Sequence, residues 1–320
     1  MKTYDVTALG ELLIDFTENG ISEQGNPLLE ANPGGAPCNV LSMLCRLGRK
    51  TAFIGKVGQD IWGNKLKEAV EEVGIDTRNL LMDKDVRTTL AFVVKKPDGD
   101  RDFAFYRSPG ADMMLSAEEV QEDLIADSRI FHFGSLSLTH PACREATKKA
   151  LRIAKENGCL ISFDPNLREP LWNSLDEAHE QIDFGMSQCD VMKIADNEVQ
   201  WFTGKEDFDE GIADLQARHG IPLILVSKGR DGSSAYYKGR RIDAAPFLQE
   251  NTIETTGAGD TFCACVLNGL LDHDIHDLQA GDLEEILRFA NAAASLITTK
   301  KGALRVMPTL EEVDLLLSSR

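Results

Sequence analysis

Strand-like and helical patterns alternate along the central part of this chain. The strand-like runs are IFHFG at 130–134, CLISFD at 159–164, CDVMKIA at 189–195 and IPLILVSKG at 221–229. One or two helical patterns, opened by capping residues, separate each run from the next. Such alternation predicts parallel strands joined by crossover helices on both faces of a sheet. We therefore expect an α/β fold built on a doubly wound, mostly parallel sheet.

A different pattern interrupts this alternation nearer the N-terminus. The runs TTLAFVVKK at 88–96 and RDFAFYR at 101–107 are joined by the residues PDGD, which are typical of a hairpin turn. This hairpin predicts a small sheet that leaves the main layer. The chain has 320 residues, 42% of them hydrophobic, and no linker-like segment. One domain with a small appended unit is therefore expected.

The charge balance narrows the range of partners. Lys and Arg number 34 against 52 Asp and Glu, which gives a formal net charge of -18. Such a surface repels phosphate backbones and anionic lipid head groups, so neither nucleic acid nor a membrane is expected as a partner. The seven cysteines form no C-x-x-C pair, and no apolar run approaches the roughly 20 residues of a membrane span. A cytoplasmic protein with reduced thiols is therefore expected.

Polar residues follow several of the predicted parallel strands. In a sheet of this kind, ligands collect at the carboxyl ends of the strands. The residues at those ends are Asp164, Asn166, Arg168, Lys193, Glu198, Ser227 and Gly229. Each of them alone is ordinary loop chemistry. Because parallel strands end at the same edge, together they predict a ligand site there.

The segment ETTGAGD at 254–260 runs directly into an apolar helical pattern. Its glycines leave the backbone N–H groups of Gly257, Ala258 and Gly259 free to converge at a helix start, the arrangement of an anion site. The Asp260 carboxylate would repel a bound phosphate, and abstraction of a proton from an attacking hydroxyl explains its presence. The alternative is a glycine-rich turn in which Asp260 only complements the helix dipole.

A second glycine segment, PGGAPCN at 33–39, also precedes a helical pattern. Gly34 and Gly35 allow the backbone to approach a small ligand closely, and Asn39 offers a donor and an acceptor to hydroxyl groups. The alternative is a tight turn with Asn39 as an ordinary first-turn residue. Asp15 lies inside the apolar run ELLIDF, where a carboxylate either faces water at a sheet edge or points toward a polar ligand.

Other catalytic signatures are absent from the sequence. There is no GxxxxGK[ST] motif, no GxGxxG after the first strand, and no HExxH or GxSxG. Their absence argues against a P-loop enzyme, a Rossmann oxidoreductase, a zinc protease and an α/β-hydrolase. Phosphoryl transfer on a different fold remains.

The two glycine segments resemble the signatures of the PfkB (ribokinase-like) sugar kinases. PGGAPCN, the helix end RLG and FIGKVG resemble the first signature, and TTGAGD with its helix resembles the second, in the order that the family has. The segments at 105–115 and 164–172 resemble the fructokinase branch. The resemblance covers nearly the whole chain. It implies a ribokinase-like three-layer fold, with residues 1–320 as one kinase domain and a β lid formed near 12–33 and 86–108.

The resemblance implies a catalytic role for the second glycine segment. Asp260 would take the proton from a sugar hydroxyl, while Gly257, Ala258 and Gly259 would stabilise charge on the transferring phosphoryl group. Arg107 would close over the acceptor with the lid and face that group. Considered alone, an arginine at the end of a hairpin is more typical of a solvated edge strand.

The resemblance also implies two binding sites. The residues expected at the sugar are Asp15, Gly34, Gly35, Asn39, Arg107, Arg168 and Asp260. The residues expected at ATP are Lys193, Ser227, Gly229, Gly232, Gly257, Gly259 and Asn291. Lys193 would point toward phosphate, and Glu198 would organise Mg²⁺ through water.

Three positions depart from the family pattern. Glu254 stands where Asp or Asn usually begins the second signature, which puts in doubt the monovalent cation (K⁺) site that family members build near that loop. Ala195 replaces the Asn of the N-x-x-E motif and leaves only Glu198. Leu41 stands where a small residue is usual.

The resemblance implies ATP-dependent phosphorylation of D-fructose at its 6-hydroxyl, and the lid strands are where a homodimer contact is expected. Two alternatives stay open. The first is the same chemistry on another substrate, such as 2-keto-3-deoxygluconate, a riboside or a sugar phosphate. The second is a catalytically silent sensor of sugar or nucleotide, although a pure binding protein gains nothing from a carboxylate beside phosphate.

Overall fold

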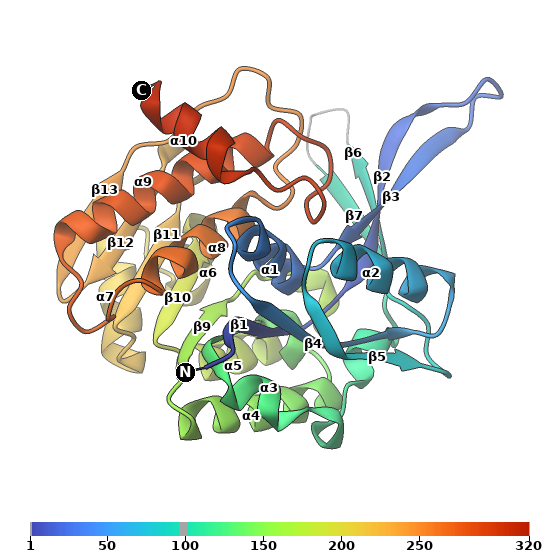
Figure 1. Ribbon diagram of the computed structural model, residues 1–320, viewed down its shortest axis with the longest axis horizontal. Helices are drawn as coiled ribbons and strands as arrows, with labels where there is room; N and C mark the ends of the chain where they lie inside the picture. Colours follow the sequence, from blue (N-terminus) through green and yellow to red (C-terminus); the bar gives the residue numbers. More distant parts are fainter. Residues whose placement is uncertain (1, 96–100, 320) are drawn as a thin grey trace.

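A nine-stranded sheet forms the centre of the molecule in the computed structural model, which describes residues 2–95 and 101–319 (Figure 1). Its strand order is β13-β12-β11-β10-β9-β8-β1-β4-β5. The strands are β1 (Tyr4–Leu9), β4 (Thr51–Gly58), β5 (Asp76–Asp83), β8 (Ser128–Gly134), β9 (Leu160–Asp164), β10 (Val191–Ala195), β11 (Leu223–Ser227), β12 (Ser233–Tyr237) and β13 (Arg240–Ala244). All neighbours from β5 to β11 pair in parallel, whereas β12 and β13 pair antiparallel at one edge. The predicted mostly parallel sheet is confirmed.

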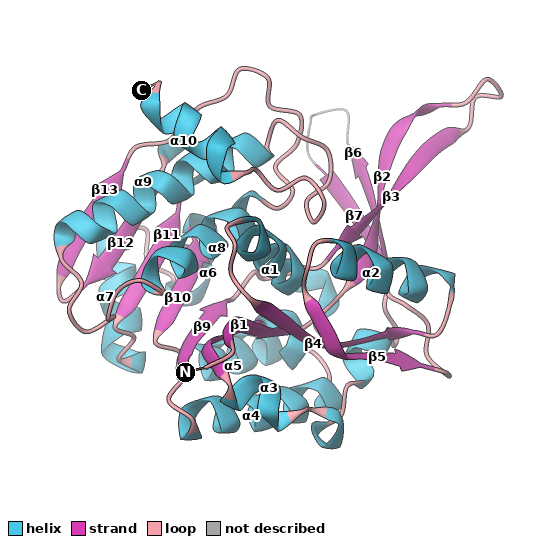
Figure 2. Ribbon diagram, viewed as in Figure 1, coloured by secondary structure: helices cyan, strands magenta, loops and turns pink. Residues whose placement is uncertain are grey.

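Helices cover both faces of this sheet (Figure 2). The helices that pack into one hydrophobic core are α1 (Ala36–Arg46), α2 (Ile61–Glu72), α8 (Ala258–Leu270), α9 (Ala280–Ile297) and α10 (Leu310–Ser318). The helices that pack into the other are α3 (Glu122–Ala126), α4 (Pro141–Glu156), α5 (Leu175–Met186), α6 (Asp196–Thr203) and α7 (Phe208–His219). Because both faces are covered, inner strands such as β4 are buried along their whole length, which explains their continuous apolar runs.

A second sheet of four strands projects from the main body, at the upper right of Figure 1. Its order is β3-β2-β6-β7, and its strands are β2 (Leu13–Ile21), β3 (Pro27–Gly34), β6 (Leu90–Lys95) and β7 (Arg101–Tyr106). Strands β6 and β7 pair antiparallel, as the hairpin pattern predicts. The predicted turn residues, 97–100, lie outside the described residues. Strand β3 of this sheet leads directly into the start of α1, beside the edge of the main sheet.

Two helix starts differ from their sequence patterns. The capping box at 116–119 predicts a helix, but only a 3₁₀ turn forms there, and α3 begins at Glu122. The Glu119 carboxylate also accepts a hydrogen bond from Lys56 Nζ at 2.6 Å. The box at 282–285 predicts a start at Asp282, whereas α9 begins at Ala280, because Asp282 accepts the Gln279 N–H and so closes the helix start itself.

None of the helices among the described residues combines the length and the apolar character needed to cross a bilayer.

Candidate active site

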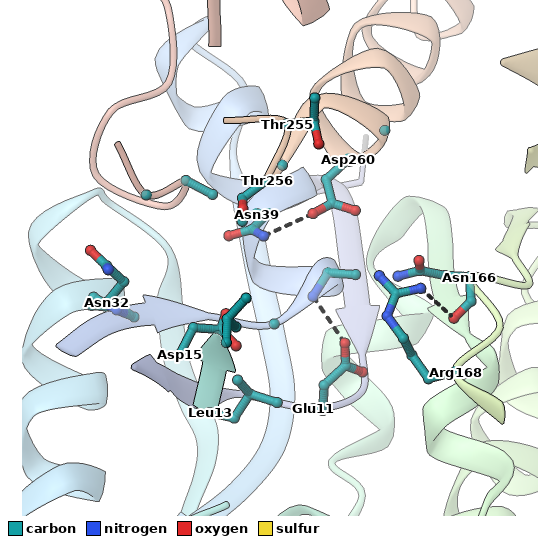
Figure 3. A pocket seen from close by; sticks show the side chains of 18 of the residues that line it. Glu11, Leu13, Asp15, Asn32, Asn39, Asn166, Arg168, Thr255, Thr256 and Asp260 are labelled. Carbon is teal, nitrogen blue, oxygen red and sulfur yellow. Dashed lines mark hydrogen bonds between the residues drawn. The ribbon is translucent and has the colours of Figure 1, made fainter. Parts of the chain in front are cut away.

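Two pockets meet at the N-terminus of α8, beside the carboxyl ends of β9, β10 and β11. The first, called here the acidic pocket, has among its lining residues Glu11, Asp15, Asn39, Arg168, Glu254 and Asp260 (Figure 3). The second, called here the apolar cleft, has among its lining residues Ser227, Gly232, Phe247, Leu248, Phe262 and Asn291. Thr255 and Gly259 line both pockets. A group passing from one ligand to the other would therefore pass this backbone.

Asp260 lies in the first turn of α8 and faces the acidic pocket. Its Oδ2 accepts a hydrogen bond from Asn39 Nδ2 at 2.8 Å. Burial raises the pKa of Asp260 to about 6, although the hydrogen bond from Asn39 opposes the rise. A carboxylate with this pKa is ionised at neutral pH and still basic enough to accept a hydroxyl proton.

One of the three N–H groups of the predicted anion site is used within the turn itself. Gly257 adopts φ 77°, in the left-handed region, and caps α8. The N–H of Ala258 donates to Thr255 O at 3.2 Å, so it closes the turn and does not point at a ligand. Gly257 and Gly259 stand at the helix start, where backbone N–H groups have no partner inside the helix. A Cβ at position 257 would lie 2.7 Å from the Cβ of Ala303, so no larger residue fits there.

Lys193 extends from β10 to the underside of this turn. Its Nζ forms an ion pair with Asp164 Oδ2 at 3.1 Å, and both side chains are buried. A Cβ on Gly259 would lie 3.1 Å from the same Nζ. Burial alone would lower the pKa of Lys193, but the carboxylates of Asp164 and Glu198 hold it above its ordinary value. A permanent positive charge therefore lies directly beside the turn.

The glycine pair before α1 makes room for the two acids of the pocket. A Cβ on Gly34 would lie 2.2 Å from Asp15 Oδ2. Gly35 has φ 127°, and a Cβ there would lie 2.5 Å from the backbone oxygen of Glu11. Burial raises the pKa of Asp15 to about 7, while the charge of Arg168 opposes the rise.

The structure does not place Arg107 where the sequence predicts it. Arg107 is buried beneath the second sheet and forms an ion pair with Asp112 at 2.7 Å. Its remaining donors go to Thr139 Oγ1 at 2.9 Å and to Leu136 O at 3.1 Å. Asp112 also accepts a hydrogen bond from the hydroxyl of Thr89. It therefore connects the residue before β6 with Arg107, the residue after β7. Arg107 is not among the residues lining either pocket, because its donors are used to anchor this hairpin. The interpretation as a solvated edge arginine is also wrong, since Arg107 is buried.

Arg168 is the arginine of the acidic pocket, in place of Arg107. It lines the acidic pocket and has no ion pair among the described residues; Nη1 donates only to nearby backbone, such as Leu167 O at 3.0 Å. Figure 3 shows its guanidinium directed toward the space between Asp15 and Asp260. Asn166, at φ 41° in the turn after β9, redirects the chain so that Arg168 reaches this point.

Glu198 fits a metal only through water. Its Oε1 accepts the N–H of Leu167 at 2.6 Å and its Oε2 accepts the N–H of Ala195 at 2.8 Å. Within residues 2–95 and 101–319, no cluster of three or more His, Cys, Asp or Glu side chains could hold a metal ion. Mg²⁺ ordinarily keeps several waters and is bound with substrate phosphates, so a single acid that contacts one of those waters suits it.

Of the seven residues expected at ATP, five line the apolar cleft, namely Ser227, Gly229, Gly232, Gly259 and Asn291, whereas Lys193 and Gly257 line only the acidic pocket of the two. Asn291 is buried, and its Nδ2 donates to Ala244 O at 3.2 Å and to Ala245 O at 3.0 Å. Its amide therefore also holds one wall of the cleft. The sequence does not single out Phe247, Leu248 and Phe262, which make this cleft apolar: Phe247 and Leu248 lie in a loop without periodicity, and Phe262 is one of many apolar residues in α8.

Comparison with known proteins shows the family to which the chain belongs. The family model described as pfkB family carbohydrate kinase matches residues 4–310. The chain belongs to this family. This kinase is 41% identical over 314 residues to fructokinase-2 of Solanum lycopersicum, with 98% of this chain and 95% of that protein covered.

Two solved structures are also similar to this kinase over nearly the whole chain. Fructokinase of Xylella fastidiosa with bound ATP has a TM-score of 0.89 and 29% identity, with 98% of each chain covered. A double mutant of fructokinase from Vibrio cholerae O395, in a form with fructose, ADP and potassium ion, has a TM-score of 0.88 and 28% identity, with 99% of each chain covered. The predicted ribokinase-like fold class is confirmed.

Glu11 is a charged residue of the acidic pocket that is not among the site residues predicted from the sequence. Glu11 follows β1 and lines the pocket opposite Asp260. The signal was present as an acid between two apolar runs, VTALG and LLIDF, directly beside the already suspected Asp15. A charged residue that interrupts buried strands is as informative as one inside them.

Proposed function

We propose that this kinase transfers the γ-phosphoryl group of ATP to the 6-hydroxyl of D-fructose. The observation that carries the proposal is that Thr255 and Gly259 line both pockets, with the base candidate Asp260 on the acidic side. The acidic pocket suits a ligand rich in hydroxyl groups and the apolar cleft suits a purine. The fructokinase relatives, one crystallised with ATP and one with fructose and ADP, support this choice of substrates.

Asp260 is the proposed general base. As the 6-oxygen of the sugar attacks the γ-phosphorus, its proton moves to Asp260, a new O–P bond forms, and the bond from phosphorus to the bridging oxygen breaks with its electrons going to ADP. Asn39 holds the Asp260 carboxylate in place through the 2.8 Å hydrogen bond. Because the pKa of Asp260 lies near 6, the base is ionised before the reaction at neutral pH.

The charge on the transferring group is stabilised from three directions in this proposal. The N–H groups of Gly257 and Gly259 point to it from the helix start. Lys193 lies beside the same turn with its charge retained by Asp164. Arg168 approaches from the opposite wall and takes the role that the sequence suggests for Arg107. Ala258 contributes to the turn rather than to the group itself.

Sugar and nucleotide are held by the remaining predicted residues. In the acidic pocket, Asp15 and Asn39 accept and donate hydrogen bonds to sugar hydroxyls, and Gly34 and Gly35 keep that wall open. In the apolar cleft, the nucleotide contacts are Ser227, Gly229, Gly232 and Asn291.

Metal binding is proposed at the phosphates. Mg²⁺ supplies charge neutralisation for the triphosphate, and Glu198 would hold one of its waters. For a monovalent cation the loop offers Glu254, whose Oε1 already accepts the Gly302 N–H at 2.7 Å. A K⁺ site there stays a prediction, which the dependence of the rate on potassium concentration tests.

The second sheet is the proposed lid of a single kinase domain. Val93 of β6 and Phe105 of β7 line the acidic pocket, so movement of the sheet would open or close it. The sheet carries exposed apolar residues, such as Ile21, Leu28 and Tyr106. These residues are the proposed homodimer contact. A cytoplasmic location fits a kinase that uses ATP.

The test is ADP release with Mg-ATP across a panel of free sugars, with a blank that lacks sugar. A clear preference for D-fructose supports the proposal. Turnover only with 2-keto-3-deoxygluconate, a riboside or a sugar phosphate keeps the mechanism and changes the substrate. Binding of sugar or nucleotide without turnover across the panel would favour the silent sensor.

A further inference from the structure

Glu11 is a buried acid without a cationic partner. It lies between β1 and β2 with 5% of its surface exposed, and it lines the acidic pocket. Its Oε1 accepts the N–H of Ala36, the first residue of α1, at 2.9 Å. Among the described residues, no ion pair involves Glu11, and its carboxyl group accepts only backbone N–H groups, its own and that of Ala36. No side chain of the described residues competes with a ligand for this carboxyl group.

The groups around Glu11 do not compensate for the free-energy cost of burying its charge. The nearest charged side chains are Arg107 and Asp112, which neutralise each other in their own ion pair. Burial raises the pKa of Glu11 to about 7, and the N–H of Ala36 only partly opposes the rise. A buried carboxyl in this state is unfavourable unless something donates hydrogen bonds to it. In a pocket built for a sugar, the available donors are hydroxyl groups.

The position of Glu11 selects which hydroxyls these are. In Figure 3, Asp260 and Asn39 lie on one side of the pocket and Glu11 lies on the opposite side, with Asp15 and Arg168 between them. A sugar whose phosphorylated hydroxyl contacts Asp260 therefore directs its far end toward Glu11. For a ketohexose in its furanose form, the groups at that end are the 1-hydroxyl and the 2-hydroxyl.

We propose that Glu11 determines sugar specificity by accepting hydrogen bonds from the hydroxyls at the C1–C2 end of the sugar. The inference rests on the proposed fructose kinase activity and assigns a residue to the end of the pocket that Asp260 does not reach. An aldopentose lacks the hydroxymethyl group at this end. Glu11 thus gives the kinase a contact that responds to the difference between a ketohexose and an aldopentose.

The experiment combines variants of Glu11 with sugars that lack one hydroxyl. The kcat/KM values of the wild type, Glu11→Gln and Glu11→Ala are measured with D-fructose, 1-deoxy-D-fructose and 2,5-anhydro-D-mannitol, which lacks the 2-hydroxyl. In the wild type, loss of a contacted hydroxyl should lower kcat/KM by about 10- to 100-fold, as expected for a hydrogen bond to a charged group. In Glu11→Ala, kcat/KM for fructose should fall by a similar factor. Removal of the contacted hydroxyl from the sugar should then lower kcat/KM of this variant by less than about 2-fold more. Glu11→Gln, which still accepts from Ala36, should lie between the two.

A matched variant separates this role from helix capping. Asp60 caps α2 by accepting the N–H groups of Trp62 and Gly63, so Asp60→Ala should lower stability and leave the ratio between the sugars unchanged. If Glu11→Ala slows all three sugars by one common factor and the preference among them persists, Glu11 is only a cap and the proposal is overturned. If the wild type does not phosphorylate fructose, the proposed function fails instead. The same coupling is then measured with deoxy analogues of the sugar that it does phosphorylate.

Discussion

Asn39, in α1, donates a 2.8 Å hydrogen bond to Asp260, in α8, across 221 residues of chain. This bond joins the two glycine-containing segments on which the family resemblance rests. Asn39 is 4% exposed, and its Oδ1 has no partner among the described residues. The amide is therefore oriented by Asp260, and its oxygen is buried without a partner from the described residues. The base and the substrate-binding wall are thus set by one contact.

Replacement of Asp260 tests the base directly. Asp260→Asn keeps the hydrogen-bonding shape but cannot accept the proton, so we expect turnover to fall by at least about 100-fold. Sugar binding, measured by calorimetry, should persist. Asp277→Asn, an exposed acid, serves as the control. Unchanged turnover in Asp260→Asn would exclude the mechanism.

Loss of Asn39 should change the pH profile. The Asn39 donor stabilises the ionised form of Asp260, so its removal raises the pKa of Asp260 further above about 6. The acid limb of kcat/KM for Asn39→Ala should therefore move to higher pH, by about one unit. The profile between pH 5 and 9 measures this shift. A limb that stays in place would show that another group controls it.

The Lys193–Asp164 pair should separate stability from catalysis. Lys193→Met leaves the Asp164 carboxylate buried without its partner, and we expect a loss of about 3–5 kcal/mol in the free energy of unfolding. Adding Asp164→Asn removes the uncompensated charge and should restore most of that stability. Turnover of the double variant should stay at least about 10-fold low, because the cation beside the phosphoryl group is still missing. Full recovery of turnover would show that the pair is structural only.

Gly34 should be replaceable for folding but not for sugar binding. A Cβ at this position would lie 2.2 Å from Asp15 Oδ2, and the carboxylate can rotate away. We expect Gly34→Ala to raise KM for the sugar by about 10-fold while unfolding changes little. Gly281→Ala, where a Cβ meets nothing within 4 Å, is the matched control. An unchanged KM would remove Asp15 from the sugar contacts.

Glu11 should oppose folding at high pH. Its pKa in the folded protein, about 7, is raised from 4.5, so the neutral form is favoured on folding. The stabilisation is fully present below about pH 4.5 and is lost as the pH rises through 7. Glu11→Gln should therefore be more stable than the wild type at pH 8, by about 1–3 kcal/mol, and similar to it at pH 4.5. Urea unfolding measures this, with the exposed Glu23→Gln as the control. An equal difference at both pH values would contradict the prediction.

Local patterns were sufficient for the sheet and for both glycine segments, but not for the arginines. Arg107 and Arg168 both follow a strand, and each could reach the site by sequence alone. Arg107 is held away because Asp112 and Thr139 meet its guanidinium from distant segments. Such contacts form only in the folded chain, so no local rule distinguishes the two residues.

The anion site shows a similar limit at shorter range. Three successive N–H groups were predicted to converge, yet Ala258 donates to Thr255. The choice depends on φ and ψ of the turn, which the neighbouring Ala303 restricts at Gly257. The glycine content of the segment predicts that a turn can form there. It does not predict which backbone N–H groups remain available to bind an anion.

The shared wall of the two pockets has a consequence for inhibition. An inhibitor that joins adenosine to a ketohexose must cross the backbone at Thr255 and Gly259. Its linker would then lie beside Lys193 and the N-terminus of α8, where negative charge is favoured. The potency of such a two-headed compound should therefore depend more on a negatively charged linker of the right length than on improvements to either end.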